Sequence, residues 1–312
     1  MNSKFQILLT GVGSYLPKKK TSNYDLEKFM DTSDEWIRKR TGIKFRHFVE
    51  DNELTSDMGT NAAELAIFNA GLKPKDIDLI ILATTTPDNT FPSTASKIQR
   101  NLGCQAISFD VQAVCAGFIY AISIGVSMLK DTHGKKCLVI GADSMSKILD
   151  WSDRSTSVLF GDGAGAVVLE KKNVINETVE TNQWGVLATK IFTNGEYYDL
   201  LSTDGGVSKN KSTGFLRMNG KEIFKHAVEK LSSSLLMCLE ECNMNINDLD
   251  WLIPHQANQR IINAVTNKVK IPQDKIISTI SNHGNTSAAS IPLALDVATK
   301  KGDIKNGDIL EI

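Results

Sequence analysis

The sequence predicts an α/β protein built from two copies of one fold. Short apolar runs, of the kind found in strands covered on both faces, alternate along the chain with helical stretches. Two pairs of segments also resemble each other at nearly the same spacing. The composition, 41% hydrophobic and 23% charged, is that of a globular protein whose 312 residues are enough for two domains or one large layered domain. These observations together favour layers of helices and sheets.

The first strand is expected near the N-terminus, where the apolar stretch in MNSKFQILLTGVGSYLP is too short for a secretory signal. The next expected elements are two helices, Ala62–Ala70 and Gly117–Leu129, and two central strands, Ile77–Thr84 and Lys136–Gly141. The polar residues 171–180 are interpreted as a connector between halves, and the Gly-, Ser- and Asn-rich residues 193–220 as a substrate-facing loop.

The internal repeat is visible in two places. The stretch NAGLKPKDIDLIILATTT resembles EECNMNINDLDWLIPHQAN at an offset of 172 residues. The helix that opens at Cys115 resembles the helix after Asn285, at an offset of 170. The agreement predicts halves at residues 1–172 and 183–312, with Cys115 and Asn285 at equivalent positions.

Charge and cysteine content exclude several classes of protein. The net charge of -1 argues against nucleic acid as a partner, because such proteins usually carry a large positive excess. No apolar run reaches the roughly 18 residues that span a bilayer. The odd number of cysteines, five, lacks a paired framework and favours a reducing cytoplasm. Cys238 and Cys242 have no second ligand pair, so no metal site is expected.

Three polar residues stand at junctions where a strand or turn leads into a helix. Cys115, in ISFDVQAVCAGF, is expected at a helix N-terminus, where free backbone N–H groups favour the thiolate. His255 follows the apolar strand LDWLI, and Asn285 opens a helix of small residues. Cys115 has a structural alternative as a buried cysteine and Asn285 as a capping residue, and beside His255 the residues Gln256 and Asn258 could cap the next helix. Brought together, they would form a nucleophile with two hydrogen-bonding partners.

The glycine-rich segment FGDGAGAVVLE, residues 160–170, is not interpreted as a phosphate loop. A dinucleotide-binding loop follows a strand and opens a helix, whereas these glycines precede an apolar, β-rich run. A tight turn into a strand is the better interpretation.

Seven stretches, in order along nearly the whole chain, resemble the β-ketoacyl-[acyl-carrier-protein] synthase III family. They are TSDEWIRKRTGIKFRH, FPSTASKIQRNLG, DVQAVCAGF, DWSDRSTSVLFGDGAGAVVLE, MNGKEIFKHAV, IPHQANQRII and HGNTSAASIPLAL. The resemblance implies a duplicated thiolase-like five-layer αβαβα fold, with Cys115 as nucleophile and His255 and Asn285 as its catalytic partners. Asn285 distinguishes this family from elongating synthases, which carry a second histidine there, and from thiolases, which carry a second cysteine.

The resemblance also implies an activity and its substrates. The activity is decarboxylative condensation of an acyl-CoA starter, expected to be acetyl-CoA, with malonyl-acyl-carrier protein, without a cofactor or metal. Two alternatives stay open: a specialised acyltransferase of secondary metabolism, and a non-catalytic protein that binds CoA or carrier protein. The second arises because family members usually continue beyond the strand matching GDILEI into a glycine-rich turn, whereas this sequence ends at Ile312.

Further site residues follow from the resemblance alone. It places Trp36 against the adenine of CoA and Arg40 and Arg154 near the nucleotide phosphates. It places Phe91 across a homodimer interface, where it would limit the acyl pocket. The remaining CoA contacts implied are Met218, Gly220, Phe224, Ala257 and Asn258. Contacts with the acidic carrier protein are implied for Lys221, Lys225 and Arg260.

Overall fold

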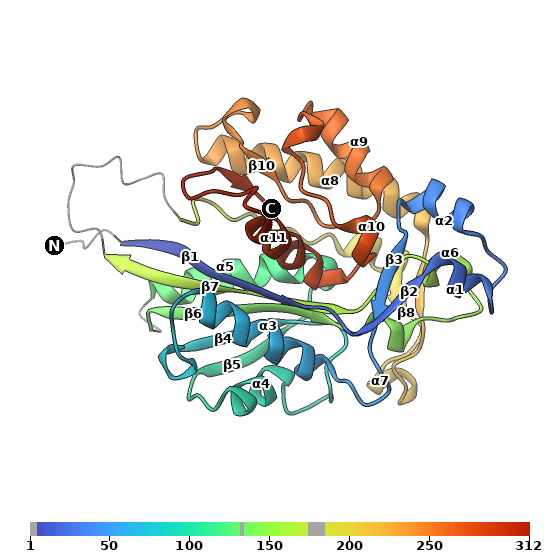
Figure 1. Cartoon of the computed structure of the whole chain (residues 1–312), viewed down its shortest axis with the longest axis horizontal. Coiled ribbons are helices and arrows are strands. Elements are labelled where there is room, and N and C mark those ends of the chain that lie inside the picture. Colours follow the sequence, from blue (N-terminus) through green and yellow to red (C-terminus); the bar gives the residue numbers. More distant parts are fainter. Residues whose placement is uncertain (1–4, 132–133, 174–184) are drawn as a thin grey trace.

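The computed structural model describes residues 5–131, 134–173 and 185–312, and has a mixed α/β architecture (Figure 1). Its larger sheet has five strands in the order β1-β7-β6-β4-β5. β4 pairs in parallel with β5 and β6, whereas β7 is antiparallel to both β1 and β6. The strands are β1 (Phe5–Tyr15), β4 (Leu79–Ala83), β5 (Ile107–Val111), β6 (Lys136–Asp143) and β7 (Gly163–Asn173).

Side chains that alternate along β4 enter two different cores. Leu79 and Ile81 pack with α5 and α11 on one face, and Ile80 and Leu82 pack with α3 and α4 on the other. This division follows from the two-residue period of a strand. The helices on the two faces are α3 (Thr55–Asn69), α4 (Thr94–Leu102), α5 (Gly117–Lys130) and α11 (Ser290–Lys301).

A second, smaller sheet lies beyond α5 and α11. β10 (Trp251–Leu252) pairs in parallel with β11 (Leu310–Glu311). Ile253 joins the core that contains α5 and α11, whereas Leu252 packs against α8 (Gly220–Glu241) and α9 (Gln259–Val269). The order α3/α4, large sheet, α5/α11, small sheet, α8/α9 gives five alternating layers (Figure 1). The predicted fold class is confirmed.

Shorter elements complete the described chain. They are β2 (Lys19–Ser22), α1 (Asn23–Glu27), α2 (Asp34–Thr41), β3 (Phe45–Phe48), α6 (Arg154–Ser157), β8 (Leu201–Thr203), α7 (Val207–Asn210), β9 (Leu216–Met218) and α10 (Ile280–His283). The 3₁₀ turns used below are η1 (Pro74–Asp76), η2 (Val114–Ala116), η6 (Ile246–Asp248) and η8 (Ser287–Ala289).

Local details recur between the two halves of the chain. In η1 the carboxylate of Asp76 accepts the N–H of Lys73, and in η6 that of Asp248 accepts the N–H of Asn245. These paired carboxylates are 172 residues apart, as the sequence offset predicts. We therefore propose that the two halves, assigned to 1–172 and 183–312, are copies of one fold.

One predicted equivalence between the halves is wrong. η2 and η8 each begin with a non-glycine residue at positive φ, Val114 at 48° and Ser287 at 51°, and each leads directly into a helix. This shared turn makes Ala288, not Asn285, the counterpart of Cys115. Asn285 lies before the turn, so the two halves contribute non-equivalent positions to the site.

Two segments differ from the sequence-based expectation. Lys171–Asn173, predicted to begin a connector, are the last residues of β7, while 174–184 lie outside the described residues. The predicted loop 193–220 contains the antiparallel pair β8–β9 and the short helix α7. In the described residues, no helix is both long and apolar enough to cross a membrane.

Candidate active site

Cys115 lies just past the carboxyl end of β5, within η2 and two residues before α5. Carboxyl ends of parallel strands are where α/β proteins place their sites. Gly117, the first residue of α5, allows a close approach, because a Cβ there would lie 3.0 Å from Ala83 Cβ and 3.6 Å from Ala288 Cβ. The nucleophile candidate is therefore held against η8 of the other half.

The structure contradicts the expectation of a ready thiolate. Burial raises the pKa of the Cys115 thiol to about 12; a hydrogen bond with Ser287 opposes this rise, and the nearby Asp143 carboxylate adds to it. Cys115 is half-buried and keeps some solvent-accessible surface. Desolvation of the thiolate is the largest of these effects on the thiol pKa. The thiol is protonated at neutral pH and must lose its proton when it attacks.

Asn285 is fixed by its backbone and by its side-chain oxygen. Its N–H donates to the carbonyl of Leu159 (2.9 Å), and its carbonyl accepts the N–H of Gly161 (3.0 Å). Its Oδ1 accepts the backbone N–H of Ser287 at 2.9 Å. A backbone N–H can only donate, so the facing side-chain atom is oxygen and Nδ2 is on the other side of the amide, where it has no hydrogen-bond partner among the described residues.

The glycine-rich segment serves this arrangement. β7 begins at Gly163, which confirms the predicted turn into a strand. A Cβ on Gly161 would lie 2.6 Å from the carbonyl oxygen of His283, so only glycine lets this segment approach the chain that carries Asn285.

His255 follows β10 and contacts the first residue of α11. Its Nδ1 lies 2.6 Å from Ser290 Oγ. Burial lowers the pKa of the imidazole to about 4, so the ring is neutral at physiological pH. With Nδ1 occupied by Ser290, Nε2 is the nitrogen left for a substrate.

The three predicted catalytic residues converge on one short segment, Asn285–Ser290. Asn285 begins it, Cys115 contacts Ser287 within it, and His255 contacts Ser290 at its end. The first half supplies the sulfur and the second half supplies two nitrogen-bearing side chains. This arrangement combines a nucleophile with two groups able to donate hydrogen bonds to a developing anion.

Asp143 forms hydrogen bonds with residues of both halves of the chain. It was not identified as a site residue from the sequence. It is fully buried at the end of β6. Oδ1 accepts the N–H of Thr85 at 2.7 Å, and Oδ2 accepts the N–H of Ala288 in η8 at 3.2 Å. Burial raises the pKa of this carboxyl, while these hydrogen bonds lower it. The available signal was an acidic residue directly after the apolar run KCLVIGA.

Three residues that the family resemblance assigns to the nucleotide end of CoA lie together. The guanidinium carbons of Arg40 and Arg154 lie 4.6 Å and 5.1 Å from the centre of the Trp36 ring. Both arginines are exposed, and Arg154 also pairs with Asp31 at 3.1 Å. The cluster is an aromatic surface beside two cations, which suits a base and its phosphates.

The predicted pantetheine contacts at α9 lie next to α2, the helix that carries Trp36. Asn258 is the N-cap of α9, and its Oδ1 accepts the N–H of Ile261 at 2.9 Å. A Cβ on Gly42, which ends α2, would lie 2.6 Å from Gln259 Cβ. This contact places the end of α2, which carries Trp36, against the start of α9, which follows His255 and Ala257 in the chain. Asn258 also keeps the capping role that was its structural alternative.

The other predicted contacts gather at the start of α8. Phe224 lies under the guanidinium of Arg260, 5.5 Å from ring centre to guanidinium carbon. Met218 ends β9 and Gly220 begins α8. Lys221, Lys225 and Arg260 are exposed, which leaves three cations on one side of the site.

Phe91 is separate from these groups. Its side chain is 82% exposed, in a loop between β4 and α4. Ile107, on the edge strand β5, is also exposed.

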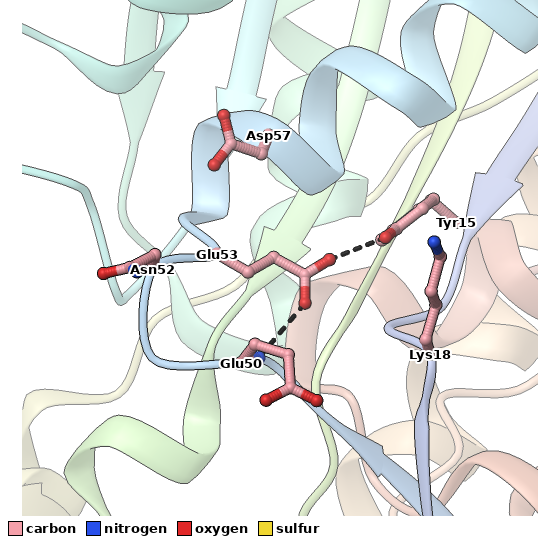
Figure 2. A pocket seen from close by; sticks show the side chains of 6 residues that line it. All are labelled: Tyr15, Lys18, Glu50, Asn52, Glu53 and Asp57. Carbon is pink, nitrogen blue, oxygen red and sulfur yellow. Dashed lines mark hydrogen bonds between the residues drawn. The ribbon is translucent and has the colours of Figure 1, made fainter.

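Two surface pockets lie elsewhere. The first, about 300 Å³, is lined by polar side chains (Figure 2). In it Tyr15 donates to Glu53 at 2.6 Å, and the N–H of Glu50 donates to the same carboxylate at 3.2 Å. The second, about 610 Å³, lies beside Asn243 and Ile309. Neither contains a predicted catalytic residue, and within the described part of the chain no three His, Cys, Asp or Glu side chains are grouped to hold a metal.

The five-layer fold, with a cysteine from one half and His255 and Asn285 from the other, defines a thiolase-like condensing enzyme. The family model for 3-oxoacyl-[acyl-carrier-protein (ACP)] synthase III matches residues 109–195, and the model for its C-terminal part matches residues 239–311.

Individual relatives agree. β-Ketoacyl-[acyl-carrier-protein] synthase III of Ehrlichia canis is 52% identical over 97% of this chain and 93% of its own. That of Wolbachia pipientis wMel is 50% identical over 99% of this chain and 94% of its own. The crystal structure of 3-oxoacyl-[acyl-carrier-protein] synthase III from Aquifex aeolicus matches with a TM-score of 0.89 at 44% identity, covering 98% of this chain and 94% of that one. The chain belongs to the β-ketoacyl-[acyl-carrier-protein] synthase III family.

Proposed function

We propose that this protein condenses an acyl-CoA starter, acetyl-CoA foremost, with malonyl-acyl-carrier protein and so begins fatty-acid synthesis. The observation that carries the proposal is the arrangement of Cys115, His255 and Asn285 around one segment. His255 Nε2 and Asn285 Nδ2 have no hydrogen-bond partner within the part of the chain that the structure describes and can donate to a substrate. The names of the relatives support the same reaction. Acyl-CoA is a substrate here, and the chemistry calls on no further cofactor.

In the first half-reaction the Cys115 sulfur attacks the acyl-CoA thioester. The new bond joins sulfur to the acyl carbon, the bond from that carbon to the CoA sulfur breaks, and the cysteine proton ends on the released CoA thiol. Because the thiol pKa is about 12 in the free protein, proton loss is coupled to attack rather than completed beforehand.

In the second half-reaction malonyl-carrier protein loses its carboxylate as CO₂. The two electrons of the broken carbon–carbon bond form an enolate, whose oxygen needs hydrogen-bond donors. His255 Nε2 and Asn285 Nδ2 supply these without a base strong enough to quench the carbanion. The carbanion then attacks the acyl-cysteine, releases its sulfur as a thiolate and forms the β-ketoacyl thioester. A solvent proton restores the thiol.

The direct test measures CO₂ released from malonyl-carrier protein labelled in its carboxylate. We expect one CO₂ for each CoA set free, and much slower release when acyl-CoA is left out. Release of CoA without CO₂ would contradict condensation.

For CoA we propose that Trp36 stacks on the adenine, with Arg40 and Arg154 beside the phosphates and Met218, Gly220, Phe224, Ala257 and Asn258 along the pantetheine arm. Stacking of a base on an aromatic side chain is worth about 1–3 kcal/mol. Trp36→Ala should therefore raise the KM for acyl-CoA about tenfold or more.

An acyl-pantetheine substrate supplies the control for Trp36→Ala, because it lacks the nucleotide and should keep its KM. Phe68→Ala removes another aromatic, 77% exposed on α3, and should leave both KM values unchanged. Equal losses with both substrates would mean that Trp36 acts through the fold and not through the base.

For the carrier protein we propose docking on the exposed cations Lys221, Lys225 and Arg260. Cations on a protein surface steer an acidic partner and lose this effect as salt screens them. A KM for malonyl-carrier protein that did not change with ionic strength would contradict this surface.

We also propose a homodimer in which Phe91 reaches the partner's acyl pocket. A large aromatic side chain that is 82% exposed suits an interface, and so does the exposed Ile107 on β5, which is an edge strand of the sheet in the described residues. A stable, active monomer in sedimentation equilibrium would contradict it.

All five cysteines are free, which supports a reducing, cytoplasmic location that cell fractionation can test.

A further inference from the structure

Ser290, which the family resemblance did not assign to the site, contacts the catalytic histidine directly. It is the first residue of α11, and its side chain is almost fully buried, with the residue 2% exposed. Its Oγ lies 2.6 Å from His255 Nδ1 and accepts the backbone N–H of Gln256 at 3.2 Å. Ser290 therefore contacts two successive residues of the second half's catalytic loop.

The hydroxyl proton of Ser290 has one evident acceptor. A hydroxyl has one hydrogen to donate and two lone pairs to accept with. The N–H of Gln256 occupies one lone pair. In the described residues the only other hydrogen-bond partner of Oγ is His255 Nδ1. Because a buried donor left unpaired is costly, the hydroxyl donates to Nδ1.

This donation fixes the tautomer of the imidazole. A neutral ring carries its proton on one nitrogen, so a ring that accepts at Nδ1 carries it at Nε2. Burial keeps the ring neutral by lowering its pKa. A backbone carbonyl in the place of Ser290 could only accept and would put the proton on Nδ1.

We propose that Ser290 is a positioning residue for the condensation: its hydroxyl holds His255 with the proton on Nε2, ready to donate to the enolate oxygen. The inference rests on the proposed function. On this proposal His255 Nε2 can donate to the enolate during decarboxylation only because the Ser290 hydroxyl, on the other side of the ring, keeps the proton there.

The first test is Ser290→Ala, assayed step by step. Loss of the hydrogen-bond partner behind a metal-ligating histidine costs about 10–100-fold, and the same orienting role at His255 suggests a loss of similar size. We expect the rate of malonyl decarboxylation to fall by about this factor, with Ser290→Thr, which keeps a hydroxyl, restoring most of it. Ser232→Ala is the matched control, because Ser232 is also 2% exposed in a helix, and among the described residues its hydroxyl bonds only Val228 O. A wild-type decarboxylation rate in Ser290→Ala would overturn the proposal.

The second test reads the wild-type protein and does not depend on turnover. The ¹⁵N shifts of selectively labelled histidines report which ring nitrogen carries the proton, and His255→Asn identifies the signal. In the wild-type protein at neutral pH we expect a protonated Nε2 and a bare Nδ1. A proton on Nδ1 would overturn the proposal. Because this readout needs no substrate, it fails independently of the proposed function, whose own failure would appear as a wild-type protein that releases no CO₂.

Discussion

Replacing Cys115 by serine should abolish transfer of a labelled acyl group from acyl-CoA to the protein, with a loss of at least about a thousandfold. A serine hydroxyl is a much weaker nucleophile than a thiol unless a positioned base activates it. In the described residues no hydrogen bond joins Cys115 to the imidazole of His255, whose Nδ1 is bound by Ser290, so no positioned base is in place to activate a serine at position 115. Intact-protein mass spectrometry after incubation with acetyl-CoA measures the transfer.

Cys242→Ser is the matched control for this experiment. Cys242 is a half-buried free cysteine at the end of α8, far from η2 in the chain and outside the site. We expect its variant to be acylated like the wild type. Undiminished acylation of Cys115→Ser would remove Cys115 from the mechanism, wherever else the acyl group was found.

Asn285→Asp should stop the second half-reaction while leaving the first. The change keeps an oxygen to accept the N–H of Ser287, which lies 2.9 Å from Oδ1, and so preserves the local turn. It replaces the free Nδ2 donor by a carboxylate oxygen, which repels a developing enolate. Loss of one such donor commonly costs about 10²–10³ in rate, and the added charge increases the loss. Labelled CO₂ release measures it.

The control is Asn282→Asp, the same substitution three residues earlier, where the side chain is exposed. It should decarboxylate malonyl-carrier protein at the wild-type rate. We expect Asn285→Asp still to form acyl-cysteine at a near-normal rate. If both half-reactions fell equally, Asn285 would be acting through the fold, and if neither fell, the amide would not be a donor to the enolate.

The layers of the fold could be predicted because they depend on local patterns. The apolar run around Leu79–Ala83 and the small-residue helix after Cys115 carry their periodicity in the sequence. The proposed repeat is supported at η1 and η6, where Asp76 and Asp248, each the first residue of an Asp-x-Asp stretch, make the same hydrogen bond to the backbone three residues earlier.

The equivalence of Cys115 and Asn285 could not be judged in the same way. The turns that correspond are defined by positive backbone φ at Val114 and Ser287. Unlike glycine, neither valine nor serine favours that conformation, so the sequence does not indicate it. Sequence self-similarity therefore aligned the helices correctly to within three residues but missed the turn in front of them.

The raised pKa of the Cys115 thiol could not be predicted from the sequence either. A cysteine near a helix N-terminus predicts a lowered thiol pKa, yet the contact of η2 with η8 buries the sulfur and brings Asp143 close, and both raise it. Asp143, Ser287 and Ser290 meet the catalytic residues across separations of up to 172 positions. Contacts of this kind arise from tertiary packing and leave no local pattern.

Analysis of the carrier-protein product tests the central claim most directly. The wild-type protein is incubated with acetyl-CoA and malonyl-carrier protein, and the mass of the carrier protein is followed with time. We expect the malonyl thioester to be converted to the 3-oxobutyryl thioester by the wild type and to stay unconverted with Cys115→Ser. A carrier protein that stayed malonylated, or that gained only an acetyl group, while acetyl-CoA still bound, would contradict the assignment of this chain as a condensing enzyme.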